Sequence, residues 1–223
     1  KKLTTFAADL HGLKGTALFL DLDVVIVDDI TPFFEQPGEF LIIHDWKRPW
    51  RVTGNSSVYR FELGAHPEVL ERFRAEHESI RARLRNEQAW LSEVLHQQGR
   101  LSYWPAAWCA SWKYHCVPRF PFNYWCTPSI PVGARILIFH GVINPPDAIA
   151  GNSRGNWRRT QPAPWVAQHW RETASALKEV LGQRDRVDQA GADPVAEVQR
   201  RHAMPRRHGF PLSDPGPSWP AGR

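Results

Sequence analysis

The chain has 223 residues, 42% of them hydrophobic and 23% charged, which is typical of a globular domain and excludes a low-complexity or collagen-like protein. No apolar run approaches the roughly 18 residues of a membrane span, and the opening Lys-Lys-Leu-Thr-Thr is not typical of a signal peptide. The net charge of +5 favours polyanionic partners, although scattered arginines are also typical of a solvated surface. We therefore expect one sizeable domain in the cytoplasm.

The three cysteines are Cys109, Cys116 and Cys126. Their spacing predicts neither a disulfide framework nor a common zinc site, even with His115 alongside. We expect reduced thiols, as is usual in the cytoplasm.

The first part of the chain is predicted to contain a buried strand. Residues 1–13 are expected to end a helix, and residues 16–27 form a near-continuous, β-branched apolar run, typical of a parallel strand buried on both faces. Asp21 and Asp23 interrupt this run two residues apart, so on a strand both carboxylates would point to the same side. A short helical turn is expected at residues 28–34.

The middle of the chain is predicted to alternate strands and helices. Strands are expected at residues 40–44 and 56–61, with a loop at 46–55 between them, and helices at 67–80 and 86–96. Asn86 stands where a helix N-cap is expected.

The last part is predicted to hold a functional loop. A short strand at 101–104 precedes residues 104–131, which are dense in Trp, Tyr, Phe and Pro; a loop of this length is usually functional. A buried strand is expected at 135–140 and a closing helix at 165–180. The domain would then span residues 1–180, followed by a disordered Pro- and Arg-rich tail at 181–223.

The carboxylate pair predicts a divalent-cation site that screens phosphate charge, and this chemistry is found in two families. Asp21-Leu22-Asp23-Val24-Val25 nominally fits the first motif of haloacid-dehalogenase phosphatases, in which Asp21 would form an aspartyl-phosphate. However, the Gly-Thr that usually follows is absent, and nothing downstream resembles that family's second acidic motif.

The alternative resemblance covers most of residues 1–170. The run from Leu18 to Val27 is similar to the metal motif of GT-A glycosyltransferases of family 8, the group of glycogenin and bacterial lipopolysaccharide galactosyltransferases, and of related uncharacterised bacterial proteins. Further landmarks follow in the expected order: Gly54-Asn55-Ser56-Ser57-Val58 resembles an Asn-(Ser/Ala)-Gly-Val strand, Asn86-Glu87-Gln88 an Asn-Asp-Gln segment, and Phe139-His140-Gly141 the final His-x-x-Gly segment.

This resemblance implies an α/β fold of the GT-A type, with a mixed, mostly parallel sheet and flanking helices. It implies a hexosyltransferase-like enzyme that moves a sugar from a nucleoside-diphosphate sugar, with a UDP-sugar as a candidate, to an unknown acceptor glycan, lipid or protein. It also implies retention of the anomeric configuration.

The resemblance further implies that Asp21, Asp23 and His140 bind Mn²⁺ or Mg²⁺, with Asp21 also contacting the ribose. The physical logic is independent of the family, since a leaving nucleoside diphosphate develops negative charge that a cation stabilises. His140 at a strand end is equally compatible with a structural histidine.

Five further residues are implied in substrate binding and catalysis. Lys2, Asn55 and Ser56 would bind the substrate, and Glu87 and Gln88 would act at the donor sugar. A purely structural interpretation stays open, because Asn55 can bond loop backbone and Glu87 and Gln88 can form a solvated helix face.

The aromatic stretch from Trp104 to Trp125 is a candidate platform for an acceptor sugar, or else a packed loop. Trp46, Trp50 and Arg51 are similar candidates.

Two departures from the family pattern favour a third hypothesis. Asn144 stands where the family has a Lys that contacts the diphosphate, with Arg154 as a candidate replacement. Only about twenty residues precede the metal motif, where the resemblance leads us to expect further strands. We therefore expect a fragment, or an N-terminally truncated and inactive binding module. No basic stripe on a recognisable module predicts nucleic-acid binding, whereas the tail is a candidate for peripheral contact with anionic lipid.

Overall fold

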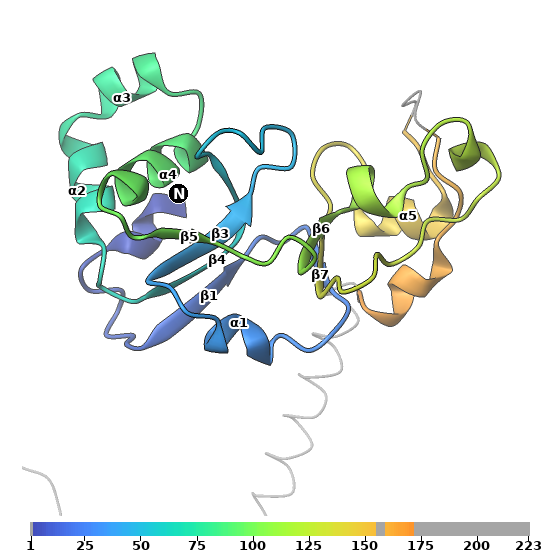
Figure 1. The fold of residues 1–223 in the computed structure, drawn as a ribbon, viewed down its shortest axis with the longest axis horizontal. Helices are drawn as coiled ribbons and strands as arrows, with labels where there is room; N and C mark the ends of the chain where they lie inside the picture. The colour runs from blue at the N-terminus through green and yellow to red at the C-terminus, as the bar shows by residue number, and fades with distance from the viewer. Residues whose placement is uncertain (1, 155–158, 172–223) are drawn as a thin grey trace, which may run out of the picture. The chain divides into compact units, whose positions relative to one another are not determined.

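A four-stranded sheet carries the first half of the fold in the computed structural model, which describes residues 2–154 and 159–171 (Figure 1). Its strands stand in the order β1-β4-β3-β5, formed by β1 (Thr16–Leu20), β4 (Gly54–Glu62), β3 (Phe40–His44) and β5 (Leu101–Tyr103). β4 is antiparallel to both β1 and β3, and β3 is parallel to β5.

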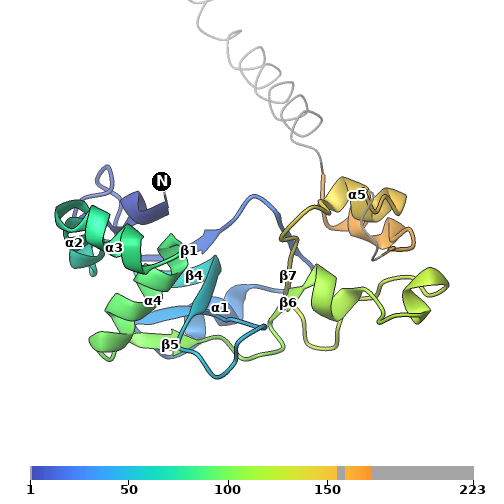
Figure 2. The same ribbon diagram turned by 90° about the horizontal axis from the view of Figure 1, so that it is seen from above.

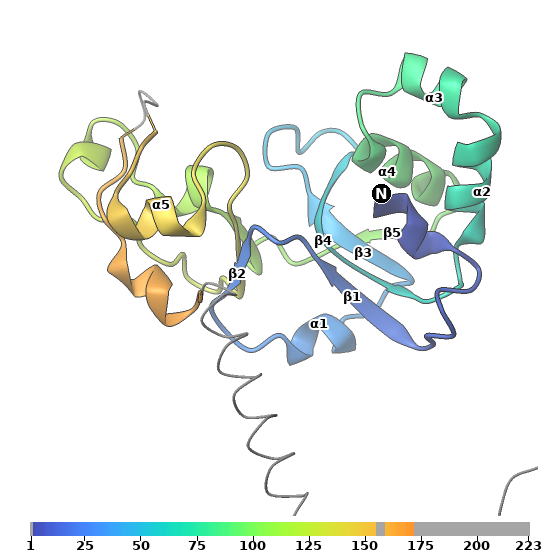
Figure 3. The ribbon, with the colours of Figure 1, turned by 180° about the vertical axis from the view of Figure 1, so that it is seen from behind.

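A second sheet of three short strands follows the order β2-β7-β6, formed by β2 (Val24–Ile26), β7 (Ile136–Ile138) and β6 (Cys109–Ser111). β7 is antiparallel to β2 and parallel to β6. The chain passes from β1 of the first sheet to β2 of the second through Asp21-Leu22-Asp23, as Figure 3 shows.

Helices cover both faces of the four-stranded sheet. The helix α1 lies on one face, and α2 and α4 lie on the other (Figures 1 and 2). The helical elements are η1 (Lys2–Phe6), α1 (Thr31–Glu35), α2 (Pro67–Ala75), α3 (His77–Arg83), α4 (Glu87–Gln97), η2 (Trp112–Cys116), η3 (Phe122–Tyr124), α5 (Pro145–Ala150) and η4 (Pro164–Gln168). Within the described residues, no helix is long and apolar enough to cross a membrane.

Alternate residues of β1 pack into different clusters, which explains why its apolar run is continuous. Ala17 and Phe19 pack against the cluster under η1, α2 and α4, whereas Leu18 and Leu20 pack against a cluster on the opposite face. We call this second cluster the seam; its buried members are Phe33, Leu41, Ile43, Val58, Trp104, Cys109, Ile136 and Ile138. Since these residues come from both sheets, the seam is the core that joins the sheets.

The α/β class with mixed sheets and flanking helices is confirmed. The expectation of mostly parallel strands differs from the structure, because antiparallel pairs outnumber parallel ones among the described strands. The sequence pattern is ambiguous here, since a continuous apolar run also arises when an antiparallel strand is covered on both faces. β1 is a half-buried edge strand rather than a fully buried central one.

Other boundaries also differ from the sequence-based expectation. The run at 16–27 is two strands, the helix expected at 67–80 is interrupted at Glu76, and the loop expected at 104–131 contains β6 and η2. A closing helix was expected at 165–180, but the described part has only the 3₁₀ turn η4 and no helix at 169–171; residues 172–180 and the tail at 181–223 lie outside the described residues.

Arg60 on β4 is a buried cation that holds α1 in place. Its guanidinium donates hydrogen bonds to the carbonyls of Phe33 (3.2 Å), Phe34 (3.1 Å) and Gln36 (2.7 Å), and also to that of Gly38. The side chain is 7% exposed. Since carbonyls at a helix end lack intrahelical partners, Arg60 satisfies groups that would otherwise be buried unpaired.

We expect Arg60→Lys to destabilise the fold by about 3 kcal/mol, because one ammonium cannot reach all the carbonyls that the planar guanidinium bonds. Urea denaturation followed by circular dichroism measures this. Arg81→Lys on the exposed surface of α3 is the matched control and should change stability little. Equal stability of both variants would contradict the role of Arg60.

His66 is a buried histidine whose charged form is disfavoured. It is 2% exposed, and its Nε2 has no hydrogen-bond partner among the described residues. Burial lowers its pKa below the ordinary 6.5; Arg100 lowers it further, whereas Glu68 and Glu39 oppose the shift. In the fold His66 is therefore neutral near pH 7.

Because the folded pKa of His66 lies below the unfolded one, its contribution to stability is present above pH 6.5 and is lost as pH falls. We expect the melting temperature of the wild-type protein to decline more steeply between pH 7 and pH 5 than that of His66→Gln. His77→Gln, an exposed control on α3, should follow the wild-type curve. Parallel curves for wild type and His66→Gln would contradict this account.

Candidate functional site

The Asp21-Leu22-Asp23 segment is a turn between the two sheets, not part of a strand. The Asp21 N–H donates to the Ser57 carbonyl in the first sheet at 2.9 Å, and the Asp23 carbonyl accepts from the Phe139 N–H in the second sheet at 2.9 Å. The turn is thus fixed by backbone bonds at both ends. The expectation that strand periodicity aligns the two carboxylates was wrong, but their charges still interact, as the pKa of Asp23 shows.

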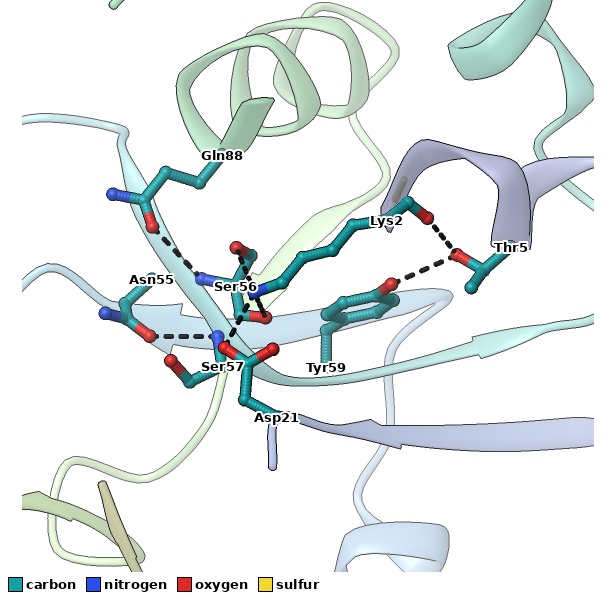
Figure 4. A network of polar contacts seen from close by, with 8 residues as sticks. All are labelled: Lys2, Thr5, Asp21, Asn55, Ser56, Ser57, Tyr59 and Gln88. Atoms are coloured by element: carbon teal, nitrogen blue, oxygen red, sulfur yellow. Dashed lines mark hydrogen bonds and ion pairs between the residues drawn. The ribbon is translucent and has the colours of Figure 1, made fainter. Parts of the chain in front are cut away.

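Lys2 on η1 connects Asp21 to β4 (Figure 4). Its Nζ lies 2.6 Å from Asp21 Oδ2, and it also donates to the Ser56 carbonyl at 3.2 Å and to Ser56 Oγ at 3.4 Å. Three residues predicted for substrate binding therefore lie in direct contact. The pairing also neutralises Asp21, which is half-buried.

Asn55 and Gln88 extend this network. Gln88 Oε1 accepts from the Ser56 N–H at 3.4 Å, and Asn55 Oδ1 accepts from the Ser57 N–H at 2.9 Å. Their amide nitrogens both point away from Lys2 (Figure 4) and have no hydrogen-bond partner among the described residues. Two amide donors are therefore available on one side of the network.

The start of α4 explains why Gln88 reaches β4. Asn86 caps the helix, since its Oδ1 accepts from the Ala89 N–H at 3.1 Å, as the sequence predicts. Glu87 is exposed in the first turn, and its charge acts on the buried Tyr59. Glu87 thus lies near the network, but among the described residues it forms no hydrogen bond with the members of the network.

Two members of the network were missed in the sequence. Thr5 Oγ1 donates to the Lys2 carbonyl at 2.8 Å and shares a hydrogen bond of 3.0 Å with the Tyr59 hydroxyl. Burial raises the pKa of Tyr59, so its hydroxyl stays protonated. No motif marks either residue, because their contact depends on how η1 folds over β4.

Asp23 is a carboxylate whose charged form is poorly stabilised by its surroundings. Burial raises its pKa and the Asp21 carboxylate adds to this shift, while its own backbone N–H and Lys2 oppose it. A cation bound between the two carboxylates would relieve this cost. The electrostatics of the pair therefore fit the predicted divalent metal ion.

His140 lies beside this turn. The register of β2 and β7 pairs Val24 with Ile138, and the bond between Phe139 and Asp23 continues it, so His140 follows directly after the pairing. Its Nε2 shares a hydrogen bond of 2.6 Å with the buried Ser111, and its ring stacks on Trp46 at 5.6 Å and 17°. Burial lowers the pKa of His140, and Lys47 and Lys113 lower it further, so the imidazole is neutral.

The three predicted metal ligands are not gathered into one ligand set. Among the described residues, no group of three or more His, Cys, Asp or Glu side chains is placed to hold a metal ion. The two aspartates meet the electrostatic requirement, whereas the His140 Nε2 is bound to Ser111. The ligand role of His140 therefore stays a prediction.

A cavity of about 690 Å³ opens next to the network. Asn55, Gln88 and His140 line it, and so do Trp46 and Arg51 from the loop between β3 and β4. Of the other aromatic candidates, Tyr114 lines the cavity, Trp104 and Trp112 are buried in the core, and Trp50 is exposed without lining it.

The candidate replacement for the missing family Lys is already engaged. The Arg154 Nε lies 2.8 Å from both carboxylate oxygens of Asp147, and Asn144 caps α5 in a reciprocal capping box with Asp147. The described cysteines Cys109 and Cys116 are buried free thiols and Cys126 is an exposed one.

Comparison with known proteins gives a resemblance to glycosyltransferases. No family model matches the chain, and no curated protein matches it. Among solved structures, the galactosyltransferase LgtC, in complex with donor and acceptor sugar analogs, is 14% identical with a TM-score of 0.40 over 58% of this chain and 54% of its own. GlyE of Streptococcus pneumoniae TIGR4 is 17% identical with a TM-score of 0.42 over 58% of this chain and 35% of its own.

An active-site mutant of LgtC is 13% identical with a TM-score of 0.40, over 64% of this chain and 57% of its own. The chain thus matches little more than half the length of LgtC and about a third of GlyE. The resemblance to glycosyltransferases that the sequence led us to expect is therefore confirmed. At these identities and TM-scores it carries no inference about activity, which depends on the site itself.

Gly54 links the network to α4, and its Cα packs closely against the side chain of Ile42. Its N–H donates to Ser92 Oγ at 2.8 Å, and that hydroxyl donates to the Gln88 carbonyl at 2.7 Å. A Cβ at this position would lie 2.7 Å from Cγ2 and 2.8 Å from Cδ1 of the fully buried Ile42.

We expect Gly54→Ala to destabilise the fold by about 1–3 kcal/mol through overpacking. Urea denaturation of a double-mutant cycle with Ile42→Val tests the cause, because removing Ile42 Cδ1 relieves part of the clash. Ile42→Val should then cost less in the Gly54→Ala background than in the wild type. Additive effects would exclude the clash as the cause.

Proposed function

We propose that this chain is a metal-dependent glycosyltransferase that moves a sugar from a nucleoside-diphosphate sugar, such as a UDP-sugar, to an acceptor. The observation that carries the proposal is the network in which Lys2, Asp21, Asn55, Ser56 and Gln88 meet at the turn between the sheets. Five residues from four separate segments of the sequence converge beside a cavity of about 690 Å³. An Asp-x-Asp motif alone would be weak support.

In this proposal the turn holds the diphosphate end of the donor. Asp21 and Asp23 would hold Mn²⁺ or Mg²⁺, with His140 as a further ligand, and the bound ion would supply positive charge to the leaving diphosphate. Lys2 adds a second positive charge beside Asp21. Lys47 and Lys113, whose charges reach His140, are better placed than the engaged Arg154 to replace the family's Lys.

The donor sugar would lie against Asn55 and Gln88. Their outward amide nitrogens supply hydrogen-bond donors for sugar hydroxyls, while their oxygens fix the side chains on β4 (Figure 4). Glu87 in the same helical turn would contact the sugar or the acceptor. We also propose retention of the anomeric configuration, which the resemblance to family 8 implies, and a cytoplasmic location, as expected from the sequence.

No observation specifically favours the phosphatase alternative. Asp21 would have to attack phosphorus, but its Oδ2 is held at 2.6 Å by Lys2. A binding module without turnover uses the same residues, so it is distinguished by activity rather than by geometry.

We expect Mn²⁺-dependent binding of UDP in calorimetric titration, with Asp23→Asn weakening it by about 10-fold or more. Titration with GDP identifies the base, and titration without Mn²⁺ measures the dependence on metal. Glu78→Gln, an exposed change on α3 outside the cavity, should bind as the wild type does.

Metal-independent binding, or equal binding by Asp23→Asn, would contradict the proposed site. Binding of UDP without hydrolysis or transfer from any UDP-sugar would favour the binding module. Hydrolysis of p-nitrophenyl phosphate that is lost in Asp21→Asn would favour the phosphatase.

A further inference from the structure

The cavity beside the network is strongly cationic. Its lining contains two carboxylates, Asp45 and Glu93, and more than twice as many cations, namely Lys47, Arg48, Arg51, Arg83 and Arg85. The cations come from two segments, the loop between β3 and β4 and the end of α3 with the connection that follows it. Like charges gathered on a concave surface attract anions, because the low-dielectric walls concentrate the field.

Most of these cations are not neutralised. Arg83 forms a two-pronged ion pair with Glu93, at 2.5 Å and 2.7 Å. The Asp45 carboxylate accepts from the Lys47 backbone N–H at 2.9 Å. Among the described residues, no carboxylate forms an ion pair with the side chains of Lys47, Arg48, Arg51 or Arg85.

The loop that carries Lys47, Arg48 and Arg51 is held in place by its backbone. The Arg51 N–H donates to the Arg48 carbonyl at 2.9 Å, His44 Nε2 lies 3.0 Å from the Arg51 carbonyl, and the Tyr103 hydroxyl donates to the Val52 carbonyl. Because the backbone of this loop is fixed, binding adds mainly the cost of ordering the cationic side chains.

Arg48, Arg51 and Arg85 are not used by the proposed donor site, although the cavity also includes Lys47 and His140, which that site does use. Lys2, Asp21 and Asp23 do not line the cavity, whereas Asn55, Gln88 and His140 line it and also belong to the proposed donor site. A donor whose diphosphate lies at the aspartates and whose sugar lies at the amides would leave the arginines for another molecule.

We propose that this cavity is the acceptor subsite and that the acceptor is a saccharide bearing a phosphate group, an inference that rests on the proposed transferase function. Arg48, Arg51 and Arg85 bind the phosphate, since guanidinium groups match its oxygens with paired hydrogen bonds. The rings of Trp46 and Tyr114 line the same cavity and are candidates for contact with the sugar; His140 stacks on Trp46, and the Lys47 ammonium lies 5.8 Å from the centre of the Tyr114 ring. The Trp46 ring is fixed by the hydrogen bond from its Nε1 to the Cys109 carbonyl at 3.2 Å.

The test is calorimetric titration of the whole chain with glucose 6-phosphate, glucuronate, glucose and inorganic phosphate at about 0.15 M salt, where weak surface attraction is screened. We expect glucose 6-phosphate to bind about 10-fold or more tightly than glucose or inorganic phosphate, because charge-assisted hydrogen bonds and sugar stacking both contribute. Glucuronate should bind more weakly than glucose 6-phosphate.

The matched variants are Arg48→Gln/Arg51→Gln in the lining and Arg74→Gln/Arg81→Gln on exposed positions of α2 and α3 outside it. The first pair should lose about 10-fold or more in affinity for glucose 6-phosphate, and the second pair should behave as the wild type. Circular dichroism of both pairs verifies that they fold. Equal binding of glucose and glucose 6-phosphate, equal or tighter binding of glucuronate, or equal loss in both pairs would overturn the inference.

Titration of the same variants with UDP and Mn²⁺ separates this inference from the proposed function. Unchanged UDP binding by Arg48→Gln/Arg51→Gln supports two distinct anion sites. Loss of UDP binding with unchanged binding of glucose 6-phosphate would assign these arginines to the donor and overturn the acceptor site while leaving a transferase. A wild type that binds glucose 6-phosphate but not UDP or GDP would contradict the transferase and with it the acceptor role, though not the phosphate site.

Discussion

The burial of the seam is the constraint on which the rest of the structure depends. Ile136 and Ile138 of one sheet pack with Leu41, Ile43 and Val58 of the other, so each sheet covers apolar surface that the other would expose. Because β1 and β2 are consecutive in the chain but belong to different sheets, the chain must turn within the three residues between them. Those residues are Asp21, Leu22 and Asp23, so the packing of hydrophobic side chains determines where two carboxylates come to lie.

Polar groups lie at this turn because its backbone is between the two sheets, after the strand pairing of β1 ends and before that of β2 begins. Asp21 bonds the first sheet and Asp23 the second, which leaves their carboxylates at the junction. Lys2 neutralises one of them, whereas Asp23 stays partly buried with a raised pKa. A carboxylate kept in this condition costs stability unless a cation joins it, and such sites are commonly functional. The cavity then adds a second region of charge, positive instead of negative, on the other side of Asn55 and Gln88.

The sequence predicted several secondary-structure elements, but not the contacts between them. Residue composition located the strands near residues 40–44 and 56–61, and the residue type of Asn86 located a helix cap, because strand propensity and capping are local properties. It could not predict that one apolar run serves two sheets, since an edge strand covered on both faces has the same pattern as a central one. Thr5 and Ser111 carry no motif. The arginines of the cavity fall in two groups, Arg48 with Arg51 and Arg83 with Arg85, more than thirty residues apart, so only the folded chain brings the two groups together.

The length of the turn between the sheets is constrained as strictly as the identity of its three residues. Because backbone bonds fix the turn at both ends, adding or removing a residue between Leu20 and Val24 must either break one of these bonds or slide β2 by one residue along β7, and such a slide would invert every side chain of β2. Val25 would then leave the core on one side and Val24 the seam on the other. The same shift would move Asp23 away from Phe139 and hence from His140. A neighbouring side chain can compensate for a substitution in this segment, but no side chain can compensate for a change in the length of the segment.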